Sequence, residues 1–129
     1  MTPVGKSKIM IIDDNPIDQL ITEHVLRLND KSRDIIVMNS ANEALAYLLL
    51  NVNAPEALPY RIFLDLDMPV MNGFDFLQHF KECVDEIKDG CSIVVVTASE
   101  RREDLERIKL NPFVLKLIAK PLQRHSLVL

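Results

Sequence analysis

The feature that most constrains the fold of this chain is a series of short apolar runs that each lead to a chemically reactive side chain. The runs occupy residues 9–12, 62–64, 93–96 and 113–118. They are followed by Asp13-Asp14, Asp65, Thr97 and Lys120 respectively. Runs of this length are typical of buried strands, and the carboxyl ends of parallel strands meet at one edge of a sheet. We therefore expect carboxylates, a hydroxyl and an ammonium to gather at that edge.

Helix signals alternate with these strand signals, which is the pattern of β-α-β units and a parallel sheet. Asn15-Pro16 is a helix start, with an N-cap followed by proline in the first turn, and Ser40 with Glu43 matches a capping box. Helices are predicted over residues 16–29, from about 41, from 74 to about 88, over 100–110 and, in a short form, over 122–129; a strand is predicted over 35–38 and a loop over 51–59. Apolar residues recur at helical spacing: Ile17, Leu20, Ile21, Val25 and Leu28, then Ala44, Leu45 and Leu48, then Phe74, Leu77, Phe80, Val84 and Ile87, then Leu105 and Ile108.

The length of the chain fits one domain. With 129 residues it can bury a proper core, and it is too short for two domains of ordinary size. Neither an internal repeat nor a linker is visible. We expect a single domain over residues 1–129, with a core over about 8–129 and no effector domain.

Charge and composition exclude several classes of function. The formal net charge is −4, and Arg101-Arg102 is followed at once by Glu103-Asp104, so no basic stripe for nucleic acid is present. The N-terminus lacks the apolar stretch of a signal peptide, and no run approaches the roughly 18 apolar residues of a membrane span. The two cysteines have no metal-type spacing and are expected to be free thiols in a reducing compartment. The sequence predicts a cytoplasmic protein that binds neither nucleic acid nor membrane.

The residue types at the expected edge indicate phosphoryl chemistry. Asp13 and Asp14 repel each other unless a cation or a lysine offsets their charge, and Lys120 is the plausible internal partner. Carboxylates are the hard oxygen ligands that Mg²⁺ prefers. A carboxylate beside that metal can attack phosphorus to give an aspartyl phosphate, while Lys and Thr donors stabilise the phosphoryl oxygens.

The complete set of motifs resembles a response-regulator receiver domain. Asp-Asp follows the first strand, Leu-Asp-Leu-Asp-Met-Pro-Val-Met-Asn-Gly the third, Thr-Ala the fourth and Lys-Pro the fifth, and the match spans nearly the whole chain. The resemblance implies a doubly wound, flavodoxin-like (CheY-like) α/β sandwich with five parallel strands in the order 2-1-3-4-5. It also implies a phosphoprotein of a two-component phosphorelay, which carries a 4-aspartylphosphate and signals by conformational change and partner binding.

The same resemblance implies a role for each site residue. Asp65 is the expected phospho-acceptor, and Thr97 and Lys120 are expected to bind the phosphoryl group, with the small Ala98 giving access. For Mg²⁺, Asp14 and Asp65 are expected as direct ligands, Asp13 as a ligand largely through water, and Asp67 through its backbone carbonyl. The expected partners are a sensor histidine kinase or phosphotransfer protein and a downstream protein. The only enzymatic reactions implied are Mg²⁺-dependent phosphorylation and dephosphorylation of its own aspartate.

Two positions depart from the family pattern. Leu117 stands where the family usually has an aromatic residue that swings inward on activation, so switching is expected to rest on Thr97 and the helix that follows it. Asp67 lies two residues after the acceptor, at a position that tunes the lifetime of the phosphoryl group, and adds a carboxylate there. The chain otherwise resembles receivers that stand alone.

Two alternative functions use the same residues. Asp65-Leu66-Asp67 matches the nucleophile and general acid of haloacid-dehalogenase phosphatases, but Asp13-Asp14 lies upstream of it, which is the wrong order, and no segment is available for a cap over substrate. A degenerate receiver that is never phosphorylated is disfavoured by the intact set of Asp14, Asp65, Thr97 and Lys120.

His24, His79 and His125 are interpreted as surface or partly buried residues, and Met68 and Met71 either pack or form an interaction surface.

Overall fold

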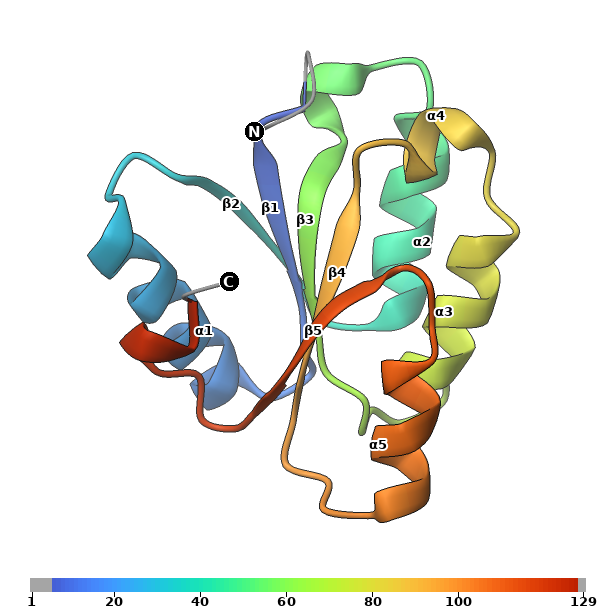
Figure 1. The fold of residues 1–129 in the computed structure, drawn as a ribbon. Coiled ribbons are helices and arrows are strands. Elements are labelled where there is room, and N and C mark those ends of the chain that lie inside the picture. The colour runs from blue at the N-terminus through green and yellow to red at the C-terminus, as the bar shows by residue number, and fades with distance from the viewer. Residues whose placement is uncertain (1–5, 128–129) are drawn as a thin grey trace.

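A five-stranded parallel sheet forms the centre of the molecule (Figure 1). The computed structural model describes residues 6–127. The strands are β1 (Lys8–Ile12), β2 (Asp34–Met38), β3 (Pro59–Leu64), β4 (Ser92–Thr97) and β5 (Val114–Ala119), and the helices are α1 (Pro16–Asn29), α2 (Ala41–Leu50), α3 (Gly73–Lys81), α4 (Asp85–Lys88) and α5 (Arg102–Lys109), with 3₁₀ turns η1 (Pro55–Ala57) and η2 (Arg124–Leu127). The strand order is β2-β1-β3-β4-β5, which confirms the predicted flavodoxin-like topology.

Helices cover the two faces of the sheet unequally. In Figure 1, α1 and η2 lie on one side, and α2, α3 and α5 lie on the other. The larger core cluster lies under α2, α3 and α5 and includes Met10, Ile62 and Phe76. The smaller cluster, under α1, includes Phe63 and Ile118. Because side chains alternate along each strand, consecutive residues such as Ile62 and Phe63 enter different clusters.

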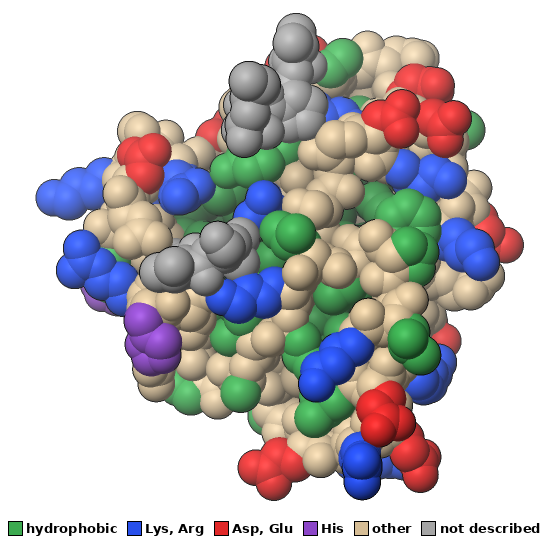
Figure 2. Space-filling view, in the orientation of Figure 1, with side chains coloured by type: hydrophobic (Ala, Val, Ile, Leu, Met, Phe, Trp, Pro, Cys, Tyr) green, Lys and Arg blue, Asp and Glu red, His purple; other side chains and the backbone are tan. Residues whose placement is uncertain are grey.

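The face of the molecule seen in Figure 2 carries mixed charge, with acidic and basic side chains interspersed on it. Within residues 6–127, none of the helices has both the length and the apolar content that crossing a bilayer requires.

Local capping fixes where the helices begin. The Asn15 side chain accepts hydrogen bonds from the backbone N–H groups of Ile17 and Asp18, as its N-cap assignment predicts. Ser40 accepts from the N–H of Glu43 at 3.1 Å, but the Glu43 carboxylate reaches the N–H of Asn39, so the predicted capping box is only half formed. A complete capping box joins Asn72 and Asp75 at the start of α3, which the sequence analysis missed.

The prediction of one long helix over residues 74–88 is wrong. α3 ends at Lys81, and Val84, whose backbone is extended, caps the separate helix α4. Cys83 and Val84 have low helix propensity, so ending the helix here costs little free energy. As a result Val84 is 51% exposed, while Phe76, which the spacing did not select, is fully buried.

The apolar face predicted for α1 is also partly wrong. Ile17 and Leu20 are 67% and 68% exposed, and Leu28 is 46% exposed. The buried residues are Thr22, Val25 and Leu26. Since only one side of a helix can meet the sheet, the remaining apolar residues of α1 form a second stripe that faces solvent.

The short last helix predicted over residues 122–129 is wrong within the described residues. The chain forms only the 3₁₀ turn η2, and residues 128–129 lie outside the described part. Leu122 is nevertheless buried against the cluster under α1.

The peptide bond between Lys120 and Pro121 is cis. Met68 is buried and Met71 packs against the larger core, so both methionines contribute to packing.

Candidate functional site

The reactive side chains selected from the sequence do meet at the carboxyl edge of the sheet. The carboxyl ends of the central strands point toward the bottom of Figure 1. An open pocket of about 400 Å³ lies at this edge. Its lining consists of Asp14, Asn15, Pro16, Asp18, Asp65, Asp67, Ala98 and Lys120. These residues come from the ends of β1, β3, β4 and β5 and from the first turn of α1.

Asp65 is fixed at the base of this edge by the backbone around it. Its N–H donates to the carbonyl of Ile12 at 3.0 Å, which ties the end of β3 to the end of β1. Gly73, at the start of α3, lies so close that an added Cβ would come within 2.8 Å of the Asp65 carbonyl oxygen. The loop between these residues therefore requires glycine at this close approach. Asp65 itself is only 5% exposed.

Lys120 reaches into the acidic edge from β5. Its backbone N–H donates to the carbonyl of Thr97 at 2.9 Å, which continues the β4–β5 pairing past the strand ends. Its Nζ lies 3.0 Å from Asp13 Oδ2, 2.8 Å from Asp18 Oδ2 and 3.4 Å from Asp65 Oδ1. An ammonium group has three N–H donors, so one is available for each carboxylate.

The electrostatics of the edge follow from burial and from these contacts. Burial raises the pKa of Asp65 from its usual 3.8 to about 6, because desolvation and the neighbouring Asp13 outweigh the attraction of Lys120. Burial opposes the charge on Lys120, but hydrogen bonds to Asp18 and Asp13 outweigh it and raise the pKa of Lys120 above its usual value. Lys120 therefore stays protonated across the physiological range, while Asp65 is only moderately acidic.

Three carboxylates at this edge suit a hard divalent cation. One oxygen from each of Asp13, Asp14 and Asp65 lies within 4.8 Å of the others. Asp14 is exposed, whereas Asp13 is buried, with one oxygen accepting from the N–H of Asn15 and the other from Lys120. An all-oxygen donor set that leaves room for water fits Mg²⁺.

The other predicted site residues take different places. Ala98 is exposed in the pocket, and the exposed Asp67 lines it. Thr97 is 2% exposed, and its Oγ1 accepts from the N–H of Ser99 at 3.0 Å rather than lining the pocket. Leu117 packs against the larger core and is not part of the pocket lining. His24, His79 and His125 lie apart, on α1, α3 and η2, and are exposed as predicted.

Asp18 is the site residue that the sequence analysis missed. It lies on the first turn of α1, four residues after Asp14, and makes the shortest of the three contacts to Lys120. An acidic residue in a first turn is usually interpreted as favourable to the helix dipole. The available signal was that this particular helix starts at the same edge of the sheet as the acidic pair.

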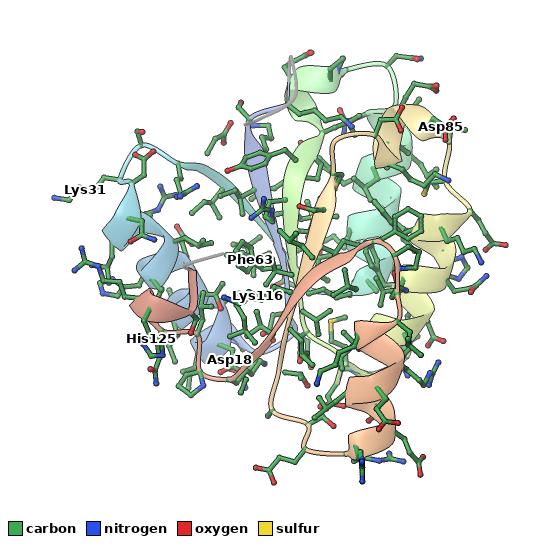
Figure 3. The ribbon with its side chains drawn as sticks, viewed as in Figure 1. Asp18, Lys31, Phe63, Asp85, Lys116 and His125 are labelled. Atoms are coloured by element: carbon green, nitrogen blue, oxygen red, sulfur yellow. The ribbon has the colours of Figure 1, made fainter. Side chains whose placement is uncertain are left out.

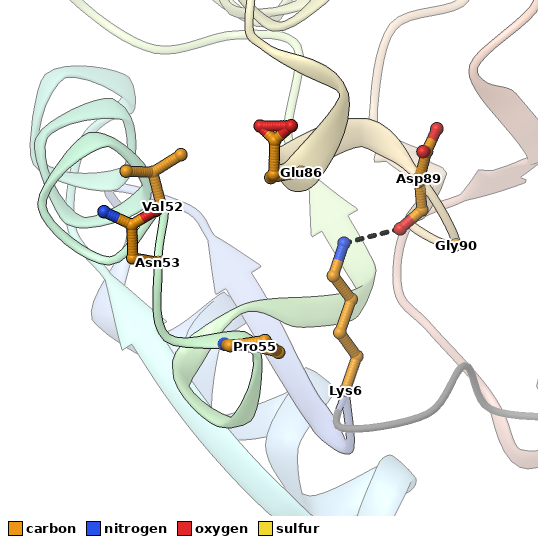
Figure 4. A pocket seen from close by; sticks show the side chains of 7 residues that line it. All are labelled: Lys6, Val52, Asn53, Pro55, Glu86, Asp89 and Gly90. Atoms are coloured by element: carbon orange, nitrogen blue, oxygen red, sulfur yellow. Dashed lines mark hydrogen bonds between the residues drawn. The ribbon is translucent and has the colours of Figure 1, made fainter.

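A second pocket lies at the opposite edge of the sheet (Figure 4). It is lined by Lys6, Val52, Asn53, Pro55, Glu86, Asp89 and Gly90. The buried Lys6 donates from Nζ to the backbone carbonyls of Ile87, at 3.2 Å, and Asp89. This lysine joins the start of the chain to the turn after α4, and its partners are backbone dipoles rather than carboxylates.

Comparisons with known proteins agree with one another on the family that this chain resembles. The family model of the response regulator receiver domain matches residues 9–129. The chain is 30% identical to the probable methanogenesis regulatory protein FilR2 of Methanothrix harundinacea, over 92% of this chain and 74% of that protein. It is 29% identical to stress response regulator protein 1 of Lodderomyces elongisporus, over 81% of this chain.

The match to the second of these relatives is to a part only, since the chain spans 27% of its length. Among solved structures, a two-component response regulator from Cytophaga hutchinsonii superposes with a TM-score of 0.84 at 23% identity, covering 93% of this chain and 90% of that one. That likeness concerns the fold.

Proposed function

Because the chain belongs to the response regulator receiver family of two-component signalling, we propose that Asp65 accepts a phosphoryl group from a sensor histidine kinase or phosphotransfer protein. The phosphorylated domain then signals through a change of conformation and the binding of a downstream protein. Asp13, Asp14, Asp67, Thr97, Ala98 and Lys120 serve this reaction and its output.

One observation supports this proposal most directly. The Lys120 ammonium lies 3.4 Å from Asp65 and 3.0 Å from Asp13, although the three groups come from the ends of different strands. A buried carboxylate with a raised pKa beside an open acidic pocket is a recognised mark of a functional site. A purely structural ion pair needs neither the pocket nor the extra carboxylates.

In the proposed transfer, an ionised Asp65 oxygen attacks the phosphorus of the donor. The new O–P bond forms as the bond from phosphorus to the donor nitrogen breaks, and the leaving imidazole takes up a proton. Charge then develops on the outer phosphoryl oxygens, toward which the Lys120 ammonium can donate. The Thr97 hydroxyl accepts from Ser99 through its oxygen, so its own proton remains free for a phosphoryl oxygen.

Asp13, Asp14 and Asp65, with the backbone carbonyl of Asp67, are the groups that would hold Mg²⁺. When bound, the ion supplies positive charge that screens the carboxylates from the incoming phosphoryl group. The chain itself contributes the oxygen donors and keeps Asp65 largely shielded from water.

The proposed output begins at Thr97 and follows a chain of hydrogen bonds. Thr97 Oγ1 accepts from the Ser99 N–H, and Ser99 Oγ contacts Asp104 Oδ2 at 3.3 Å in the first half of α5. Ile108 is the one residue of α5 that is buried, so a single side chain anchors that helix in the core, while Arg107 lies over the Phe74 ring at 3.9 Å. A Thr97 hydroxyl drawn toward a phosphoryl group therefore pulls on a weakly held element.

The test is phosphorylation by acetyl phosphate with Mg²⁺, followed by intact mass measurement. We expect the wild-type chain to gain about 80 Da, the mass of one phosphoryl group, and Asp65→Asn to gain nothing. Asp85→Asn is the matched control, because Asp85 is 80% exposed and lies at the opposite end of the molecule from Asp18 and the site (Figure 3). An undiminished adduct on Asp65→Asn excludes this acceptor, and no adduct on wild type favours a degenerate receiver.

A further inference from the structure

The first turn of α1 places a carboxylate on the lysine of the site. Asn15 caps α1 by accepting from the N–H groups of Ile17 and Asp18, which fixes the backbone at Asp18. The Asp18 side chain therefore takes no part in capping, and it reaches Lys120, which directly follows β5. Figure 3 shows Asp18 at the end of α1 that lies beside the chain leaving β5.

The three carboxylates around Lys120 are not equivalent. Asp18 makes the shortest contact, at 2.8 Å, while Asp65 lies at 3.4 Å. The Asp18 side chain is 31% exposed, against 6% for Asp13 and 5% for Asp65. Water can replace Lys120 at Asp18 at low cost, but cannot do so at the two buried carboxylates.

From this geometry we infer that Asp18 is a positioning residue that competes with the phosphoryl group of Asp65 for the Lys120 ammonium. This inference rests on the proposed function. Asp18 holds the ammonium close to the acceptor while Asp65 is free, and it is the partner that Lys120 gives up when phosphoryl oxygens arrive. Asp18 also lines the pocket, so its charge repels an anionic phosphoryl donor. The competition for Lys120 and the repulsion of the donor both weaken the binding of a phosphoryl group.

The test measures the affinity of beryllium fluoride with Mg²⁺, which stands in for the phosphoryl group on Asp65. Asp18→Asn keeps an oxygen that can accept from Lys120 and removes the charge. We expect it to bind beryllium fluoride about threefold to tenfold more tightly than wild type. Asp18→Glu keeps the charge and should return the affinity to within about twofold of wild type.

A matched control removes the same charge from the same helix. Glu23→Gln deletes a carboxylate whose ion-pair partner is Arg27, at 3.1 Å, and it should leave the affinity unchanged. Salt gives a second readout that a merely structural role would not move. Because Asp18 is partly exposed, its effect should shrink at about 1 M NaCl, where the Debye length is about 3 Å.

The outcomes separate this inference from the proposed function. If wild type binds beryllium fluoride and Asp18→Asn binds it equally or more weakly, the competition is refuted and the proposed function stands. If wild type gains no acetyl-phosphate adduct and no beryllium fluoride, the proposed function itself fails. Tighter binding by Asp18→Asn and by Glu23→Gln alike also refutes the inference, because the effect is then one of net charge.

Discussion

The two edges of the sheet each hold a lysine that is largely shielded from solvent, and they hold it in opposite ways. Lys6, at the amino edge, is 6% exposed and donates to the backbone carbonyls of Ile87 and Asp89. Lys120, at the carboxyl edge, has a side chain that is 15% exposed and contacts three carboxylates. Carbonyl dipoles are fixed by the chain and cannot change charge. Carboxylates can be protonated, bind metal or accept a phosphoryl group, and each of these events alters the force on the lysine.

This difference separates a structural lysine from a responsive one. The contacts of Lys6 fasten this early part of the chain to α4 and the turn before β4 through backbone carbonyls, whose charge does not change. The contacts of Lys120 join β1, β3, α1 and β5 through groups whose charge the proposed function changes. Substitutions at each edge, compared with one another, measure how distinct the two edges are.

The largest expected contrast comes from replacing each lysine with methionine, which is also unbranched, is one atom shorter and carries no charge. Lys120→Met should slow phosphorylation by acetyl phosphate about 100-fold or more, because the donor to the phosphoryl oxygens is lost. Lys6→Met should leave that rate within about twofold and lower the free energy of unfolding by about 1.5–3 kcal/mol, the usual contribution of hydrogen bonds to a charged group. Rates come from intact mass against time, and stability from urea unfolding. A Lys6→Met protein that is fully folded but is phosphorylated slowly contradicts the distinction between a structural and a responsive lysine.

The next contrast concerns metal. Asp14→Ala should lower the phosphorylation rate about tenfold or more at saturating Mg²⁺, because the residue proposed as a direct oxygen ligand is removed. Asp14 is exposed, so its loss should barely change stability. Glu86→Ala, on the rim of the opposite pocket, is the control and should behave like wild type. Phosphorylation that continues unchanged in EDTA rules out the metal requirement.

The carboxyl edge should also make stability depend on pH through Asp65. Its pKa is raised from 3.8 to about 6 in the folded protein, so the folded state binds the proton more tightly than the unfolded chain does. Stability from this group is therefore fully present below about pH 3.8 and is lost as pH rises from there through about 6, by up to about 3 kcal/mol in total.

The variant Asp65→Asn removes that titration. It should match wild type near pH 4 and be more stable at pH 8, by about 1–3 kcal/mol. Urea unfolding without Mg²⁺ at a series of pH values between 4 and 8 measures the difference. Parallel curves for the two proteins would show that Asp65 titrates with the same pKa when folded and unfolded.

The sequence was sufficient to predict most of the residues that meet at this carboxyl edge. The apolar strands, their parallel order and the residues at their ends follow from local patterns, since burial on both faces demands continuous apolar runs. Asp18 could not be found in this way. Its contact to Lys120 joins positions 102 residues apart, and nothing local distinguishes it from an ordinary first-turn acid.

The errors in the fold have the same origin. The apolar stripe of α1 that includes Ile17 and Leu20 has a helical period, but the period cannot say which side meets the sheet. The break between α3 and α4 at Val84 is favoured by weak local propensities and settled by packing. Val70, in the loop after Asp65, has a φ of 68°, an unfavourable conformation for a β-branched residue that no sequence signal indicated.

The smallest expected effect is the response of α5 to phosphorylation. The link from Thr97 through Ser99 to Asp104 consists of single hydrogen bonds, and Leu117 replaces the aromatic residue that the family pattern would add to the switch. We expect a coupling on the order of 1–2 kcal/mol, the usual range between sites. That energy corresponds to a change of about 5- to 30-fold in amide hydrogen exchange over residues 98–110.

Two controls show whether this response travels through Thr97. Thr97→Ala should still gain the adduct on Asp65 while losing most of the exchange response in residues 98–110, because the hydroxyl that joins the phosphoryl group to Ser99 is absent. Residues 85–89, beside Lys6 at the opposite edge, should exchange equally in both states, because their contacts to that lysine run through fixed carbonyls. A response confined to residues 65–73 would place the output in the acceptor loop, and an equal response beside Lys6 would remove the distinction between the two edges.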